Sequence, residues 1–163
     1  KLYLFCSEYS SDYKYVLSEL YDLIIEYNLQ ENVIINSEYF QEESIQKNLS
    51  IADLIVYPYQ ESFESSSASV RQGIASGKPV LVTPSNIFND ILSLVHVTQG
   101  FSSRDLYVSI KKHLTNREEF DKINKNLQNQ KVKPWLKSCN FSRLAVRLTN
   151  MIKALEIDNS VIK

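Results

Sequence analysis

The sequence predicts an α/β fold, a doubly wound (Rossmann-like) parallel sheet with helices on both faces and a helical C-terminal tail. Short β-branched runs alternate with helical segments of about ten to fifteen residues, and parallel neighbours need such crossovers. Residues 116–156 contain no strand candidate. The 163 residues are 44% hydrophobic, enough for one sizeable core. We therefore expect a single domain over 1–163, with an α/β core over 1–115 and a helical tail over 116–163.

The first part of the chain predicts a strand, a helix and a second strand. Residues 2–6 form a short apolar run, and residues 10–12 (Ser-Ser-Asp) are typical of a helix start. Apolar residues over 16–27 then recur with the spacing of a helix that lies on a sheet. The run at 33–35 is too short for anything but a strand.

The alternation continues through the middle of the chain. Residues 41–52 predict a helix, and 54–57 predict a strand that Pro58 ends. A second β-branched strand is expected at 79–82, and residues 91–97 combine a helix end with a strand. A further helix is expected over 102–114. No internal repeat or low-complexity linker interrupts the pattern.

The segment ESSSASVRQGIASGKPV, residues 64–80, lies between two of these strands. Its helix is expected to begin among Ser65, Ser66 and Ser67, and Gly77 fits the left-handed position after the helix end. One serine suffices as a cap, whereas three in a row add short donors beside the partly positive helix start, which suits a phosphate. In doubly wound sheets such loops at the carboxyl ends of strands bind ligands. The segment is therefore the candidate site.

Charge is distributed unevenly along the chain. Residues 1–103 hold 5 basic and 13 acidic residues, and 104–163 hold 13 basic and 6 acidic ones. We expect the basic part to pair mainly with the acidic part of the same chain, with a phosphate or an anionic membrane as the alternative. The overall charge of −1 and the absence of interleaved aromatics disfavour nucleic acid. The apolar stripe of the tail, from Phe141 to Leu155, is interpreted as core packing, with a partner surface as the alternative.

Other classes of site find little support. Cys6 and Cys139 are far apart in the sequence, so neither a disulfide framework nor a zinc site is indicated. His96, within an apolar run, is interpreted as a hydrogen-bonded core residue, and His113 as a surface residue. No Asp-x-Asp pair or histidine cluster indicates a metal. The start at Lys1 lacks a signal peptide and an initiator Met, so we expect a piece of a longer protein.

Two stretches of the chain resemble a known family. ADLIVYPYQESFE, residues 52–64, is similar to the Ala-Asp strand and following proline of the C-terminal, nucleotide-sugar-binding half of GT-B glycosyltransferases of the retaining family 4. ASGKPVLVTP, residues 75–84, is similar to that family's Ala-x-Gly-x-Pro-Val turn and strand. The resemblance covers most of the chain. It implies transfer of a sugar from a nucleotide diphosphate to a hydroxyl, with retained configuration and without an essential metal or other cofactor.

The family places two glutamates, with seven residues between them, between these stretches. Alignment on Gly77 and Pro79 assigns the first to Glu64 and the second to Gln72; Glu61 would misalign the turn. The resemblance therefore makes Glu64 the predicted catalytic residue, which accepts hydrogen bonds from sugar hydroxyls. Gln72 departs from the family, and its neutral amide weakens each bond to a ribose hydroxyl by roughly half.

Four further residues complete the predicted donor site. Ser65, Ser66 and Ser67 are expected at the phosphates. Arg71 stands where the family commonly has an apolar residue, and we weigh a role at the diphosphate equally against a solvent-facing position. The family's first strand and its basic pair would precede Lys1. An upstream acceptor-binding domain is therefore an expected partner, together with a nucleotide sugar and an acceptor glycan or lipid-linked saccharide.

Three alternatives stay open. A receiver-like regulatory module is disfavoured, because Cys6, Ser7 and Asn36 stand where clustered aspartates are needed. A non-catalytic GT-B-like scaffold is favoured by Gln72. A sugar-nucleotide epimerase of GT-B shape would be expected to keep more acid and base residues. The family further implies a bacterial, cytoplasmic polysaccharide pathway, with peripheral attachment to the inner membrane through the missing half.

Overall fold

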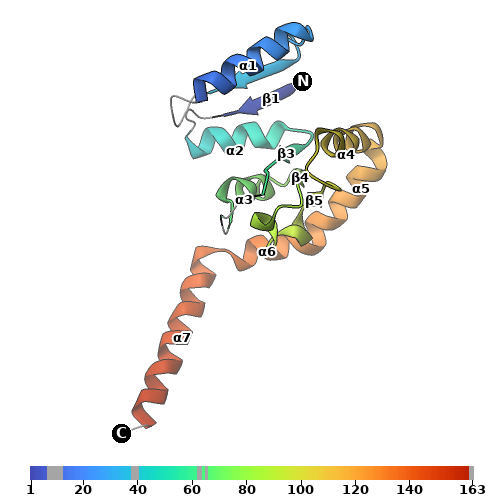
Figure 1. Cartoon of the computed structure of the whole chain (residues 1–163). Helices are drawn as coiled ribbons and strands as arrows, with labels where there is room; N and C mark the ends of the chain where they lie inside the picture. Colours follow the sequence, from blue (N-terminus) through green and yellow to red (C-terminus); the bar gives the residue numbers. More distant parts are fainter. Residues whose placement is uncertain (7–12, 38–40, 62–63, 65, 162–163) are drawn as a thin grey trace. The chain divides into compact units, whose positions relative to one another are not determined.

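The computed structural model describes residues 1–6, 13–37, 41–61, 64 and 66–161. The chain divides into two compact units, residues 1–45 and 46–163. Each unit is described separately below, and the ribbon is shown in Figure 1. The expectation of a single domain with a core that ends at residue 115 stays a prediction.

The first unit is a β-α-β motif. Strands β1 (Leu2–Phe5) and β2 (Val33–Asn36) pair in parallel, with Leu2 opposite Val33 and Phe5 opposite Asn36. Helix α1 (Tyr13–Glu26) is the crossover between them. It ends where Asn28 takes a left-handed φ of 53°, a conformation that asparagine tolerates. The two strands and the end of α1 lie within a residue or two of the predicted bounds, and the predicted helix start at 10–12 lies outside the described residues.

A three-stranded parallel sheet forms the centre of the second unit. Its order is β3 (Ile55–Tyr57), β4 (Val80–Val82) and β5 (His96–Val97), with Ile55 opposite Val80 and Leu81 opposite His96. Helix α2 (Glu42–Ile51), which begins in the first unit, precedes β3. Helix α3 (Ala68–Ala75) connects β3 to β4. The parallel α/β class predicted from the alternation is confirmed.

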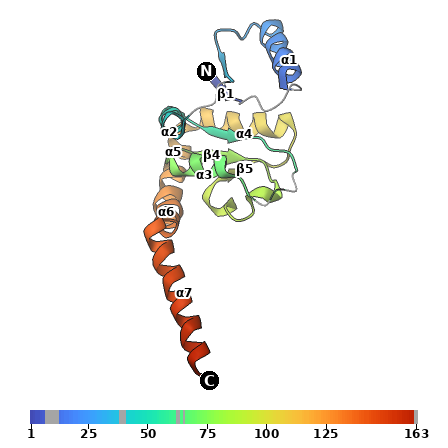
Figure 2. The ribbon, with the colours of Figure 1, turned by 90° about the vertical axis from the view of Figure 1, so that its left-hand side faces the viewer.

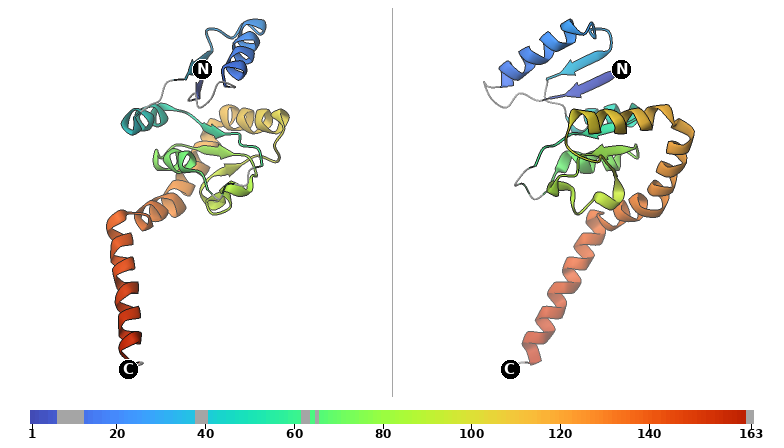
Figure 3. Two further views of the ribbon diagram at one scale, coloured as in Figure 1. Left: turned by 60° about the vertical axis from the view of Figure 1, so that its left-hand side comes forward. Right: turned by 45° about the vertical axis from the view of Figure 1, so that its right-hand side comes forward.

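Helices lie on both faces of this sheet. Two short 3₁₀ turns, η1 (Asn86–Phe88) and η2 (Leu92–Leu94), join β4 to β5. Helix α4 (Ser103–Thr115) follows β5, and a reciprocal capping box between Ser102 and Asp105 fixes its start. Figure 2 shows α3 and α4 beside the strands, and in both views of Figure 3 the strands lie between these helices.

The hydrophobic core lies between β3, β4, α3 and the 3₁₀ turns. Leu81 and Phe88 are fully inaccessible to solvent, and Ile74, Ile87 and Ile91 are almost so. β4 is buried along its whole length, as expected for the middle strand of a parallel sheet. Because the strand itself is buried, the carboxyl edge of the sheet is formed by the loops that follow each strand.

The helical tail is not uniform. Helix α5 (Arg117–Leu127), a π-helical segment η3 (Gln128–Val132) and helix α6 (Lys133–Ser138) run on from one another. Val132 of η3 is fully buried in the core of the second unit, and Trp135 and Leu136 pack against it. Residues 117–138 therefore contribute to the core.

Helix α7 (Phe141–Val161) corrects one expectation. The apolar stripe was interpreted as core packing, yet every described side chain over 141–155 is exposed. Phe141, the first residue of the stripe, is 89% exposed. Because no apolar neighbour within the described part of the chain covers it, the stripe is an uncovered surface.

Candidate functional site

The predicted site lies at the carboxyl edge of the three-stranded sheet. β3 ends at Tyr57 and α3 begins at Ala68, so residues 58–67 form the connecting loop. β4 ends beside it at Val82, because Val82 pairs with Tyr57. This is the edge at which parallel α/β sheets bind ligands.

Ser67 is the N-cap of α3. Its backbone is extended (φ −117°, ψ 120°), and its hydroxyl accepts the N–H of Val70 at 3.5 Å. The same hydroxyl lies 3.0 Å from Ser69 Oγ, and the Ser67 residue is buried. Ser67 is therefore engaged in starting the helix. Ser66 is exposed, and Ser65 lies outside the described residues.

Two tyrosines that sequence reasoning missed attach α3 to the strand. Tyr57 Oη donates to Ser69 O at 2.7 Å, and Tyr59 Oη lies 2.8 Å from Ser69 Oγ. A methyl group on Gly73 would lie 2.8 Å from Tyr57 Oη, so the close approach requires glycine there. Burial raises the pKa of the Tyr57 phenol, which keeps it a neutral donor. In the sequence, the available signal for these two contacts was the alternating placement of Tyr57 and Tyr59 on either side of Pro58.

The loop is also held from the neighbouring strand. The hydroxyl of Thr83, directly after β4, donates to Tyr59 O, and Ser85 Oγ donates to Gln60 O at 3.2 Å. Thr83 and Ser85 are both fully buried. These bonds fix the first residues of the loop, Tyr59 and Gln60, against the strand beside them.

The remaining predicted residues lie along the same segment. Glu64 is exposed, and Gln72 is partly buried on α3. Gln72 O accepts a weak hydrogen bond from Gln46 Nε2 at 3.5 Å. The structure brings Ser67 and Arg71 into contact, because Arg71 Nη1 donates to Ser67 O at 2.8 Å.

Arg71 has a second partner that the sequence did not indicate. Its Nη2 forms an ion pair with Asp90, which lies between η1 and η2. About a third of the Arg71 side chain is exposed, so the pair lies at the surface. The guanidinium is therefore oriented along the start of α3, with a carboxylate beside it.

The two histidines come together on the α4 side of the sheet, which the sequence did not predict. The His96 and His113 rings lie 5.0 Å apart, and both contact Phe120 of α5. His113 is half-buried rather than on the surface, and its Nδ1 bonds Ser109 O at 2.6 Å. His96 Nε2 is buried without a hydrogen bond of ordinary geometry among the described residues, although the side chain of Asn124 lies close enough to affect the pKa of this histidine. Burial lowers the pKa of His96 to about 4.

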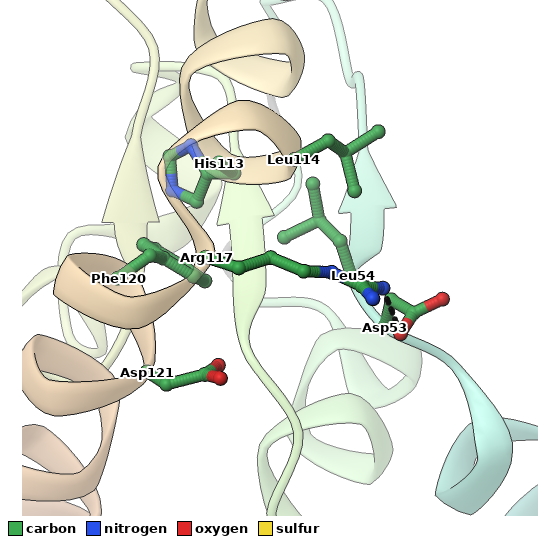
Figure 4. A pocket seen from close by; sticks show the side chains of 7 residues that line it. All are labelled: Asp53, Leu54, His113, Leu114, Arg117, Phe120 and Asp121. Carbon is green, nitrogen blue, oxygen red and sulfur yellow. Dashed lines mark hydrogen bonds and ion pairs between the residues drawn. The ribbon is translucent and has the colours of Figure 1, made fainter.

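Two pockets lie away from the predicted site. One of about 160 Å³ is bounded by Asp53, Leu54, the end of α4 and the start of α5, and Figure 4 shows Arg117 reaching across it to Asp53. The other, of about 350 Å³, lies between β5 and α4 and includes both histidines. Neither contains Glu64, Arg71 or Gln72. Within the described residues, no group of three or more His, Cys, Asp or Glu side chains is placed to hold a metal.

The sheet, its crossovers and the loop at its carboxyl edge define a Rossmann-like α/β protein. More particularly, the chain has the fold of one part of GT-B glycosyltransferases, which confirms the resemblance found in the sequence at the level of fold. No family model matches the chain, and no curated protein matches it by sequence.

The similar solved structures are distant in sequence. Anabaena Alr3699/HepE in complex with UDP and glucose aligns with a TM-score of 0.69 at 15% identity, over 94% of this chain and 40% of that one. The complex of the same protein with UDP-glucose aligns with a TM-score of 0.64 at 18% identity, over 83% of this chain and 40% of that one. Sucrose-phosphate synthase from Thermosynechococcus elongatus aligns with a TM-score of 0.65 at 17% identity, over 86% of this chain and 34% of that one. The chain thus spans at most 40% of these proteins.

Proposed function

We propose that the chain is the donor-binding half of a glycosyltransferase, which transfers a sugar from a nucleotide diphosphate to a hydroxyl acceptor. The anomeric configuration is retained, and no metal is required. The reaction would break the bond between the anomeric carbon and the diphosphate oxygen and form one to the acceptor oxygen. The acceptor proton passes to the departing phosphate or to solvent.

One observation carries the proposal. The loop at the carboxyl edge of β3 leads into the start of α3, with Glu64 and Ser66 exposed beside it. The first N–H groups of a helix have no partner within the helix, and the helix dipole adds partial positive charge. This combination fits an anionic diphosphate with sugar hydroxyls next to it. The similar proteins that were solved with UDP or UDP-glucose support the same ligand class.

Each predicted residue then has a role. Ser65 and Ser66 donate to the phosphates, while Ser67 caps the helix that presents them. Glu64 accepts hydrogen bonds from the transferred sugar, and Gln72 accepts one from the ribose. Arg71 adds positive charge at the diphosphate, with Asp90 fixing its orientation. Charge on the leaving diphosphate is thereby stabilised without a metal.

The rest of the catalytic cycle requires an acceptor site. We propose that an upstream domain supplies it and binds the acceptor glycan or lipid-linked saccharide. The cytoplasmic, bacterial polysaccharide setting that the resemblance implies stays a prediction.

The test is a calorimetric titration of the protein with UDP, GDP and their common sugars. Saturable binding of one nucleotide sugar is expected. Glu64→Gln should weaken the binding of that nucleotide sugar by roughly ten- to a hundredfold, since hydrogen bonds to a charged group contribute about 1.5–3 kcal/mol. The free nucleotide should bind Glu64→Gln as it binds the unmodified protein, because Glu64 contacts only the sugar.

Glu61→Gln is the matched control, because Glu61 is an exposed glutamate of the same loop. It should leave both affinities unchanged, and a loss at Glu61 instead of Glu64 would show that the residue assignment is wrong. Gln72→Ala should weaken nucleotide and nucleotide sugar alike. If the protein at its natural length bound no nucleotide sugar, the proposal would fail. The non-catalytic scaffold, consistent with the neutral Gln72, would then be preferred.

A further inference from the structure

Three hydroxyl groups meet at the start of α3. Tyr59 Oη lies 2.8 Å from Ser69 Oγ, and Ser69 Oγ lies 3.0 Å from Ser67 Oγ. Ser67 Oγ donates more weakly to Tyr59 Oη, at 3.5 Å, so the three hydroxyls form a closed ring. A hydroxyl donates one hydrogen and accepts up to two. The ring therefore uses all three hydroxyl hydrogens, and Ser67 Oγ can still accept the N–H of Val70.

Tyr59 is the member of this ring that lies outside α3 and its cap. Its carbonyl oxygen accepts a hydrogen bond from the hydroxyl of Thr83, directly after β4. Its ring packs against Phe88 of η1 with 5.4 Å between the centroids, and Phe88 is fully inaccessible to solvent. The Tyr57 ring meets it edge-on at 6.1 Å. The sheet and the hydrophobic core therefore fix the position of the Tyr59 hydroxyl.

The start of α3 depends on such contacts with the rest of the fold. The helix has only eight residues, Ala68–Ala75, and helices this short are not stable by themselves in water. Its cap is weak as well, because Val70 N lies 3.5 Å from Ser67 Oγ, at the limit of hydrogen bonding. The orientation of the first N–H groups therefore depends on what holds Ser67 and Ser69. The Tyr59 hydroxyl contacts both of these side chains.

We propose that Tyr59 is a positioning residue for the diphosphate of the donor nucleotide. Its hydroxyl holds Ser67 and Ser69, and these keep the first turn of α3 in the orientation in which its N–H groups meet the phosphates. Tyr59 contacts protein rather than ligand, because its hydroxyl is used within the ring. The inference rests on the proposed function, since it takes a nucleotide diphosphate as the ligand.

Tyr59→Phe tests the proposal, because it removes one oxygen atom while the ring keeps its packing against Phe88. The affinity is measured by calorimetry on the protein at its natural length, with whichever of UDP and GDP the unmodified protein binds. It should fall about two- to tenfold, which is what one hydrogen bond contributes. The corresponding nucleotide sugar should lose the same factor, because the sugar lies outside the affected contact.

Tyr107→Phe is the matched control. It also removes a tyrosine hydroxyl and a hydrogen bond, to Lys111, but both residues lie on the exposed side of α4. Both affinities should stay unchanged in this variant. An equal loss in Tyr59→Phe and Tyr107→Phe would overturn the proposal.

A double-mutant cycle shows whether Tyr59 acts through Ser69. Ser69→Ala breaks the ring at the same contact, so it should lower the affinity by a similar factor. The double variant Tyr59→Phe/Ser69→Ala should then bind as tightly as Ser69→Ala alone, because both changes remove one shared interaction. Losses that multiply would show that the Tyr59 hydroxyl reaches the ligand by a separate route, and the positioning role would be wrong.

A purely structural role for Tyr59 gives a different result. It would lower the free energy of unfolding in urea but leave the affinity of the folded protein unchanged, which would also overturn the proposal. Without nucleotide, the Val70 amide hydrogen should exchange faster in Tyr59→Phe than in the unmodified protein or in Tyr107→Phe. Equal exchange in all three proteins would show that the hydroxyl does not hold the helix start.

Failure of this proposal is distinguishable from failure of the proposed function. If the unmodified protein binds the nucleotide and Tyr59→Phe binds it equally tightly, only the role of Tyr59 is overturned. If the protein at its natural length binds no nucleotide, the proposed function fails, and the positioning of a diphosphate by Tyr59 fails with it.

Discussion

Acid pH is expected to destabilise the second unit through His96. This residue lies on β5 beside His113 of α4 and Phe120 of α5, so its ring joins one strand to two helices. Burial lowers the pKa of His96 from 6.5 to about 4, and the neighbouring His113 adds to the effect. The pKa of His113 is lowered as well, mainly by burial. The pocket between β5 and α4 that includes both histidines is also lined by Lys112, Arg104 and Asp105.

The sign follows from which state binds the proton first. The unfolded chain protonates His96 near pH 6.5, whereas the folded protein resists protonation until about pH 4. The contribution to stability is therefore complete above pH 6.5 and is lost as the pH falls towards 4. A separation of about 2.5 pH units corresponds to about 3.4 kcal/mol. Part of the ring is accessible to solvent, so screening reduces the expected loss to about 1.5–2 kcal/mol.

The assay is urea unfolding at pH 7.5 and pH 4.5, for the unmodified protein and for His96→Gln. The amide of glutamine does not titrate, whereas every carboxylate titrates in both proteins. The unmodified protein should lose about 1.5–2 kcal/mol more than His96→Gln between the two pH values. Equal losses, or a larger loss in the variant, would refute the reasoning, because the His96 proton would then be taken up equally in both states.

Two further substitutions test how the site is supported. Gly77 has a φ of 76° and open space around its Cβ position, so Gly77→Ala should cost only the left-handed backbone penalty of about 1–2 kcal/mol. Gly77→Asn should cost less stability than Gly77→Ala, because asparagine tolerates the left-handed conformation. Thermal unfolding in which the alanine variant is the more stable of the two would contradict this. Thr83→Val keeps the shape of a fully buried side chain but leaves Tyr59 O without its donor. The free energy of unfolding should fall by about 1–3 kcal/mol. Thr83→Ser keeps the donor, and only the valine variant should weaken nucleotide binding in calorimetry.

Local signals in the sequence predicted most of the elements near the site. The β-branched runs and the three- and four-residue spacings identified the strands and the helices between them, because these signals depend on neighbours only a few residues away. The helix start among the serines and the left-handed Gly77 were confirmed, since caps also depend on adjacent residues. The alternation of elements then implied a parallel sheet and the edge at which its loops gather.

Only the tertiary structure decided which distant residues meet. Asp90 orients Arg71, Thr83 holds Tyr59, and the two histidines share Phe120, although no sequence pattern joins these positions. The stripe on α7 has the same periodicity whether it is buried or exposed, so its sequence predicted the helix but not the exposure. The sequence by itself determined the α/β class and the loop that leads into α3, because backbone conformation and periodicity are local. Pairing and burial are set by residues brought together only when the chain folds.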